Sequence, residues 1–328
     1  MNLRGNDIPY NPVFFSYAFF YFSSKLCYVD LFINKLKAED KEILDHCKEN
    51  NINLFDYDDI YKELQNKDYI TIIDSCSTNF RMYEKVMNNP IDKIKLLEID
   101  CIEHLKSVKN KTEIEGFRNA NIKDSVALIK FFAWLEEEIL IKKKKINEYE
   151  IGIKNKEFRK DQEYFMGESF APIWDCGSNA AIVHYEQNEN LHSDMEINKI
   201  FLCDTGAQYM DGTTDITRTV HFGNPTQKEK EMYTRVLLGN LSLERICFNE
   251  GESLLDIDSI PRFNLHVIGK DYGHATSHGV GHFLNVHEGP RGKPLKLGNI
   301  ITNEPGYYEN DKFGIRIENE ILVVKKNN

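Results

Sequence analysis

Short apolar runs alternate with polar, helix-compatible stretches along residues 1–108. The apolar runs predict strands at residues 13–22, 25–32, 52–55 and 69–73, and the polar stretches predict helices at residues 40–49 and 58–66. The first two strands are expected to pair with each other. This order of elements indicates a small α/β domain. The region does not cluster His, Cys and carboxylate side chains, so it offers no chemistry of its own.

A different pattern begins near Lys111 and predicts a long helix. Thr112 and Glu115 have the spacing of a capping box at its start. Four apolar residues then fall on one face at helical spacing, namely Ile122, Val126, Ile129 and Ala133. The lysine run at residues 142–145 is interpreted as a solvated loop, and a second helix is predicted at residues 148–160. We place a domain boundary at about residue 108.

The second part of the chain predicts further strands at residues 180–185, 199–207 and 213–221, with a turn at Asp211 and Gly212. Thr226 and Glu229 cap another predicted helix, which is expected to run to Gly251. Helices and strands are mixed, and neither a βαβ series nor a repeat of solenoid length is evident.

Length, composition and charge exclude several classes of protein. A length of 328 residues allows two domains, and 41% hydrophobic with 28% charged residues is ordinary for a soluble globular protein. The formal net charge of -11 argues against a nucleic-acid partner, because phosphate binding needs a basic face. The seven cysteines are scattered without a CxxC pair, which indicates a reducing cytosol. The apolar run at residues 13–22 is too short to span a membrane, and no targeting signal is expected.

Candidate chemistry first appears in the segment CDTGAQYMDGTTDITRT at residues 203–219. Asp204 and Asp215 would lie roughly opposite each other if the chain reverses at the turn that contains Asp211. Two carboxylates on one face of a sheet repel each other unless cations neutralise them, so the pair predicts a metal site. A surface hairpin with solvated aspartates is the alternative.

The segment GHATSHGVGHFLNVHEGP at residues 273–290 carries four of the ten histidines, which are His274, His278, His282 and His287. The spacing of the first two resembles a zinc-binding HExxH helix, but Ala275 replaces the glutamate, and Gly279 and Gly281 disfavour a helix. We instead expect an irregular backbone that approaches a site closely, with one or more imidazoles as ligands or hydrogen-bond donors.

Residues 300–324 add carboxylates to this set. Glu304 precedes Pro305, and the strand pattern after it places Arg316, Glu318 and Glu320 on one face and Ile315, Ile317 and Ile321 on the other. Two aspartates, one histidine and two glutamates form an oxygen-rich ligand set that suits a pair of Mn, Co or Zn ions. Such a pair of ions can catalyse metal-assisted hydrolysis.

The motifs DTGAQYMDGTTDITRT, SHGVGHFLNVHEGP, TNEPGYYE and GIRIEN, in this order, closely resemble those of the aminopeptidase P family of pita-bread metallopeptidases. The resemblance implies an α+β protein with a pita-bread catalytic domain at residues 109–328. Residues 1–108 would be an incomplete, creatinase-like middle α/β domain, and the first domain of the longer relatives is expected to be absent. Ala275 and Ser277 depart from the family motif, and residues 254–264 look shortened.

The resemblance also implies a ligand assignment. Asp204 would hold one metal ion, His278 and Glu304 the other, and Asp215 and Glu318 would bridge both. The expected metal is manganese, with cobalt or zinc as alternatives.

Further residues match positions around the substrate in the family. His184, His274 and His287 are expected to orient the peptide and to stabilise the tetrahedral intermediate, and Arg316 to lie beside the bridging glutamate and the substrate. The mechanism implied is attack of a metal-bridging hydroxide on the carbonyl before proline, with Glu304 as proton acceptor.

The function implied is that of a cytoplasmic aminopeptidase acting on peptides with proline in the second position, without a nucleic-acid or membrane partner. A homodimer is one expectation, because relatives often dimerise through the catalytic domain. Two alternatives remain open, namely a prolidase-type dipeptidase and a truncated, catalytically impaired binding protein of the same fold.

Overall fold

The computed structural model describes residues 1–22, 27–64, 70–74, 77–97, 101–290 and 292–326. These residues form two compact units, one of Met1–Ile8 and Val13–Ile102, the other of Pro9–Pro12 and Glu103–Asn328. Both units mix helices with strands, which confirms the expected α+β organisation. The domain boundary at residue 108 stays a prediction. Within the described part of the chain, no helix combines the length and the apolar character that a bilayer crossing requires.

The first unit contains a three-stranded sheet of order β1-β2-β3. Strand β1 (Ser16–Phe22) runs antiparallel to β2 (Cys27–Ile33), and β2 runs parallel to β3 (Ile52–Asp56). A second sheet pairs β4 (Thr71–Asp74) with β5 (Ile94–Leu97) in parallel. The helical elements of this unit and the helix that leads out of it are η1 (Lys35–Ala38), α1 (Lys41–Glu49), η2 (Tyr57–Asp59), α2 (Ile60–Glu63), α3 (Phe80–Met87), η3 (Ile91–Lys93) and α4 (Cys101–Ser107).

Most elements predicted for this unit are confirmed. The two aromatic strands pair as expected, and α1 begins behind Asp40, whose side chain accepts a hydrogen bond from the Glu42 amide. The helix predicted at residues 58–66 is present as η2 followed by α2. Residues 25–26 and 69 of two predicted strands and residues 65–66 of this helix lie outside the described residues.

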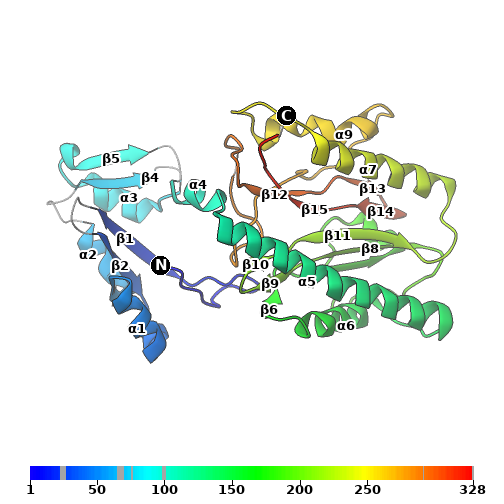
Figure 1. Cartoon of the computed structure of the whole chain (residues 1–328), viewed down its shortest axis with the longest axis horizontal. Helices are drawn as coiled ribbons and strands as arrows, with labels where there is room; N and C mark the ends of the chain where they lie inside the picture. The colour runs from blue at the N-terminus through cyan, green and yellow to red at the C-terminus, as the bar shows by residue number, and fades with distance from the viewer. Residues whose placement is uncertain (23–26, 65–69, 75–76, 98–100, 291, 327–328) are drawn as a thin grey trace. The chain divides into compact units, whose positions relative to one another are not determined.

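The second unit consists of helix pairs packed on antiparallel strands (Figure 1). Its sheets have the orders β11-β8-β7, β10-β9-β6, β12-β15 and β13-β14. The strands are β6 (Phe165–Glu168), β7 (Ile173–Cys176), β8 (Ile200–Thr205), β9 (Ala207–Tyr209), β10 (Gly212–Thr213), β11 (Ile216–His221), β12 (Ile300–Asn303), β13 (Gly306–Glu309), β14 (Phe313–Arg316) and β15 (Asn319–Leu322). The helical elements are α5 (Lys111–Glu136), η4 (Glu137–Ile141), α6 (Glu148–Lys160), η5 (Gly177–Ala181), α7 (Gln227–Arg245), α8 (Leu254–Ile257) and α9 (Ser259–His266).

Helix α5 buries a different face from the one suggested by its apolar pattern. The predicted stripe is exposed, with Ile122 at 64% and Ile129 at 68% of their full accessibility. The buried face instead contains Phe117, Ala120, Asp124, Ala127, Leu128, Phe131 and Leu135. The prediction was wrong because this face is interrupted by Asp124. The buried Arg159 of α6 pairs with that carboxylate through two hydrogen bonds of 2.8 and 2.9 Å.

Three local predictions in this unit also need correction. The capping box of α5 is formed by Asn110 and Glu113 rather than by Thr112 and Glu115, because asparagine fills the same capping role two residues earlier. Residues 180–185 are not a strand, since the 3-10 helix η5 occupies their start. Helix α7 is capped by Thr226 and Glu229 as predicted, but it ends at Arg245 rather than at Gly251.

The Arg159–Asp124 pair also supports the central strands. Arg159 donates to the Thr205 hydroxyl at 2.5 Å and to the Gly206 carbonyl at 3.0 Å. Gly206 has no room for a side chain, because a Cβ there would lie 2.0 Å from the Thr214 carbonyl oxygen. Helices α5 and α6 therefore hold the end of β8 in place, directly beside Asp204.

Candidate metal centre

Two aspartates of the predicted site lie on neighbouring strands. Asp204 lies in β8, and Asp215 directly precedes β11. The antiparallel ladder places Asp204 opposite Thr217, so Asp215 lies diagonal to Asp204 just beyond the paired residues. The predicted convergence is confirmed with this offset. Asp211 lies in the turn between β9 and β10, where Lys123 pairs with it at 2.7 Å.

His278 comes from the segment at residues 273–290, which contains neither helix nor strand, as its glycines predicted. Its Nδ1 lies 2.9 Å from the Gly279 carbonyl oxygen, which can only accept, so Nδ1 carries the proton. Its Nε2 then faces carboxylate oxygens of Asp215 and Glu304, each at 3.4 Å. This buried nitrogen makes no hydrogen bond. A histidine that donates from one nitrogen and points the other at carboxylates is arranged as a metal ligand.

Two glutamates enter the site from the C-terminal strands. Glu304 directly follows β12, and Glu318 lies between β14 and β15. The Thr302 hydroxyl donates to Glu304 at 3.1 Å, and the Thr217 hydroxyl donates to Glu318 at 2.6 Å. These bonds orient each carboxylate and leave its other oxygen for a further partner.

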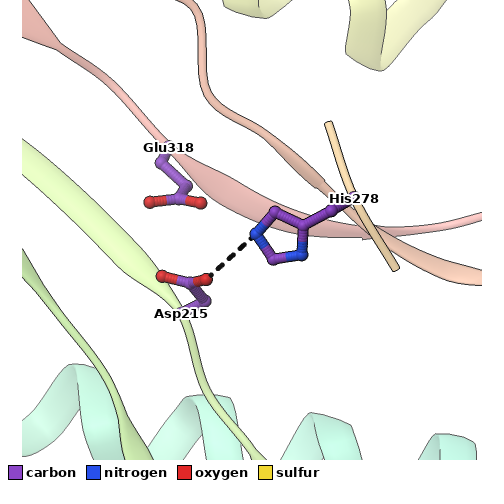
Figure 2. Close-up of side chains that lie close together, drawn as sticks. All are labelled: Asp215, His278 and Glu318. Atoms are coloured by element: carbon purple, nitrogen blue, oxygen red, sulfur yellow. Dashed lines mark ion pairs between the residues drawn. The ribbon is translucent and has the colours of Figure 1, made fainter. Parts of the chain in front are cut away.

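Ligand atoms of Asp215, His278 and Glu318 lie within 4.8 Å of one another, and Figure 2 shows both carboxylates beside the imidazole. Burial is the main cause that raises the pKa of Asp215 and of Glu318, and neighbouring carboxylates raise it further. Burial likewise raises the pKa of Glu304 to about 7. Burial alone would lower the pKa of His278, but Asp215 and Glu304 raise it to about 9. All four shifts indicate a site that stabilises positive charge.

A hydrogen-bonded chain leads from the acidic cluster to His274. Arg316 is buried and donates to one oxygen of Asp204 at 2.6 and 3.1 Å. Its other terminal nitrogen donates to the Tyr308 hydroxyl at 2.8 Å. His274 donates from Nδ1 to the Ala275 carbonyl at 2.9 Å, so its Nε2 accepts from Tyr308 at 2.8 Å. Burial lowers the pKa of His274 to about 4, which keeps this imidazole neutral.

The other predicted histidines lie in different surroundings. The ring of His287 packs against that of His278, with centroids 4.2 Å apart and an edge-on orientation. His184 follows η5 and is exposed. It lies close enough to His274 for its charge to contribute to the lowered pKa of that group, after burial and the nearby arginines. His282 packs edge-on against Phe117.

Three contributing residues were not singled out from the sequence. Tyr308 lies on β13, where strand alternation places Tyr307 in the core and Tyr308 towards Arg316. That alternation, beside the predicted acidic face, could have indicated Tyr308. The hydroxyls of Thr217 and Thr302 had no such signal, because threonine is common in strands.

The residues present fit a pair of divalent cations. Asp204 has one oxygen held by Arg316, and its other oxygen is buried without a hydrogen bond. His278 Nε2 is likewise buried without one. A buried polar atom without a partner costs free energy unless something coordinates it. Together with the raised carboxylate pKa values, these atoms form an oxygen-rich ligand set for hard or borderline metal ions.

Family profiles match both parts of the chain. The profile of metallopeptidase family M24 matches residues 115–325, and the creatinase/prolidase N-terminal domain profile matches residues 1–113. The chain is 43% identical over 341 residues to a probable Xaa-Pro aminopeptidase P of Sordaria macrospora, covering 98% of this chain and 54% of that protein. It is 44% identical over 339 residues to a protein of the same name in Phaeosphaeria nodorum, covering 98% and 51%. The chain thus spans about half the length of these curated relatives.

Solved structures show the same architecture. The X-prolyl aminopeptidase of Caenorhabditis elegans, described as a cytosolic enzyme with a di-nuclear active site, superposes with a TM-score of 0.87 at 33% identity, covering 97% of this chain and 52% of that one. The prolidase of Pyrococcus furiosus superposes with a TM-score of 0.71 at 26% identity, covering 91% and 85%. The expected pita-bread fold with an N-terminal creatinase-type domain is confirmed.

Proposed function

The chain belongs to metallopeptidase family M24, and from that premise we propose that it is a two-metal aminopeptidase that removes the first residue from peptides with proline in the second position. The observation that carries this proposal is the approach of the expected ligands from distant parts of the chain, with ligand atoms of Asp215, His278 and Glu318 within 4.8 Å of one another and Glu304 3.4 Å from His278. Two of them, Asp204 and His278, present buried atoms that lack hydrogen bonds. Relatives that match 98% of the chain carry the name Xaa-Pro aminopeptidase P, which supports the substrate class.

The ligand assignment follows the resemblance, and the short distances among Asp215, His278 and Glu318 support it. Asp204 would hold one ion, His278 and Glu304 the other, and Asp215 and Glu318 would contact both. When bound, two such ions lower the pKa of water to supply a hydroxide near neutral pH and polarise the carbonyl under attack. We propose manganese as the metal, with cobalt or zinc as alternatives.

The chain's own residues would supply the proton transfers and the positioning. Glu304 would accept the proton from the attacking water, since one of its oxygens is fixed by Thr302 and the other lies 4.0 Å from His274. His274 lies near Glu304, with its Nδ1 4.0 Å from the second oxygen of that carboxylate, and would orient the peptide and stabilise the tetrahedral intermediate. His184 and His287 would orient the peptide at the edge of the site, and Arg316 would fix Asp204 and contact the substrate side.

Proline in the second position is compatible with this chemistry. An imide nitrogen carries no N–H, so a proline-specific site needs no acceptor for it and can select the ring by shape. We further propose the cytoplasm as the location and a homodimer as an oligomeric state to be tested. The C. elegans relative is described as cytosolic, which supports the first of these.

Purified protein incubated with the tripeptide Arg-Pro-Pro, with and without manganese, tests the proposal. We expect metal-dependent release of arginine that the Asp215→Asn variant abolishes, because that carboxylate is expected to contact both ions. Two bound manganese ions without any release would favour the binding protein of the same fold instead.

A prolidase-type dipeptidase is the second candidate, favoured by the likeness to the P. furiosus prolidase over 91% of this chain. Arg-Pro-Pro and the dipeptide Arg-Pro separate the two activities. Turnover of the dipeptide alone would reject the aminopeptidase proposal.

A further inference from the structure

We propose that Arg262 is a positioning residue that fixes His274 for the reaction by clamping the backbone of the loop at residues 271–277, which carries this histidine. The inference rests on the proposed function, because it concerns the efficiency of the same site. Arg262 lies in α9, four residues beyond Asp258 and outside every motif that carries the family resemblance. Its side chain is 12% exposed.

The guanidinium group bonds to the loop on both sides of Gly273. One terminal nitrogen of Arg262 donates to the His274 carbonyl at 2.7 Å. The other donates to the Tyr272 carbonyl at 2.7 Å and to Asp271 at 2.8 Å. The guanidinium also lies over the Tyr272 ring, 4.0 Å from its centroid. A planar group with several donors in a fixed fork can span these acceptors at once, which an ammonium group cannot.

Asp258 extends the clamp to the next residue of the loop. One oxygen of Asp258 accepts from Arg262 at 2.8 Å, and the other accepts from the Thr276 hydroxyl. Because Thr276 donates to Asp258, its oxygen accepts from the Tyr272 hydroxyl at 2.6 Å. Arg262 and Asp258 together therefore contact the loop before, at and after His274.

The support beneath the clamp is rigid. Helix α9 packs closely on α7, where a Cβ on Gly239 would lie 2.3 Å from the Pro261 carbonyl oxygen. The loop belongs to no helix or strand at residues 273–276, and the Glu304 amide, which donates to the Thr276 carbonyl at 2.9 Å, bonds near its end rather than at His274. Its conformation is therefore expected to depend on contacts from α9. A shift of about 1 Å in a reacting group can cost roughly 100-fold in rate, so a clamp on this loop has catalytic consequences.

Arg262→Met is the test variant, and Arg235→Met is its matched control. Arg235 also pairs with an acid four residues earlier, Glu231, and also donates to a backbone carbonyl, that of Asn264 at 2.9 Å, but it does not contact the loop. We expect Arg262→Met to lower kcat for Arg-Pro-Pro by roughly 10- to 100-fold, with KM changed by less than about twofold. Arg235→Met is expected to keep kcat within about twofold of the unmodified protein.

A double-mutant cycle distinguishes positioning from general damage to the fold. If Arg262 acts through His274, Arg262→Met in a His274→Ala background costs less than about twofold in kcat, because the group it positions is already absent. Additive losses in the two backgrounds would overturn the proposal, as would equal losses in the Arg262 and Arg235 variants.

Amide hydrogen exchange of residues 271–277, followed by mass spectrometry, tests the clamp independently of catalysis. We expect faster exchange in Arg262→Met and unchanged exchange in Arg235→Met. Unchanged exchange in both would reject the clamp even if the protein is an active peptidase. Conversely, faster exchange in a protein that hydrolyses no peptide would leave the clamp intact and reject only the proposed function.

Discussion

The candidate metal centre is built from two regions that are stabilised in different ways. The strand region contributes the four carboxylates from β-strands or their immediate ends, namely Asp204, Asp215, Glu304 and Glu318. Backbone ladders and the buried Arg159–Asp124 pair hold the chain there. The histidine region contributes His278 from an irregular segment that closely approaches neighbouring backbone. Because the supporting contacts differ, we expect different kinds of substitution to disturb the two regions.

Close backbone contact replaces regular hydrogen bonding in the histidine region. Gly279 forms isolated bridges with Glu288 and Ile301, and a Cβ at this glycine would lie 1.8 Å from the Gly289 carbonyl oxygen. Only glycine permits that approach. Both regions contain glycines without room for a Cβ, such as Gly206 and Gly279. The histidine region differs because it lacks a strand ladder and depends on side chains that bind its backbone.

The largest effect is expected from Glu318→Gln in the strand region. This glutamate is expected to contact both ions, so its neutralisation should reduce bound manganese from two ions per chain to nearly none and lower kcat/KM by roughly 10⁴-fold or more. His278→Ala, from the histidine region, is expected to lose one ion only. Metal content after gel filtration measures both, and equal losses would contradict the assignment of a bridging and a terminal ligand.

Arg159→Met tests the support of the strand region. Removing the guanidinium leaves Asp124 buried without its cation, which should lower the free energy of unfolding by about 3–5 kcal/mol. Urea denaturation measures this loss. The double variant with Asp124→Leu is expected to recover part of it, because no buried charge then remains. A loss below about 1 kcal/mol in the single variant would show that the pair does not hold the strands.

Thr217→Val should produce a smaller effect confined to metal binding. The Thr217 hydroxyl donates to Glu318 at 2.6 Å, and loss of such a bond to a ligand typically weakens metal binding or activity by roughly 10- to 100-fold. Titration with manganese measures the affinity. Thr219→Val is the control, since Thr219 is buried on the same strand but bonds to the Arg316 backbone. Equal loss of manganese affinity in both variants would indicate that altered packing of the strand, and not the lost bond to Glu318, weakens metal binding.

The smallest effect is expected on the exposed face of α5. Ile129→Ser should change the free energy of unfolding by no more than about 0.5 kcal/mol, because this side chain is 68% exposed. Phe131→Ala, on the buried face beneath the strand region, should cost about 3–5 kcal/mol. Thermal or urea denaturation measures the free energy of unfolding of both variants. A large effect at Ile129 would indicate that this face is covered in solution.

Much of the candidate site could be predicted from the sequence because its chemistry is local. Asp204 and Asp215 are separated by a turn signal, so their convergence follows from a hairpin. The irregular backbone around His278 follows from Gly279 and Gly281. Grouping these residues with Glu304 and Glu318 required the resemblance, since each carboxylate alone is equally typical of a surface.

Other features could not be predicted because they depend on contacts between distant segments. The face of α5 that is buried depends on Arg159, which lies in another helix and pairs with Asp124. The tautomer of His274 depends on the Ala275 carbonyl and on Tyr308, and the latter lies far along the chain. The proposed role of Arg262 could not be predicted, because it depends on the packing of α9 against the loop at residues 271–277.

By itself, the sequence determined the ligand residue types, their order and the character of the elements that carry them, because helix and strand periods and turn residues act over short distances. The tertiary structure alone decided which apolar face is buried, which imidazole nitrogen is free and which arginine holds the histidine loop. These features depend on burial and on hydrogen bonds between residues far apart in the sequence. A periodic pattern defines the faces of a helix or strand but does not identify the segment that packs against each face.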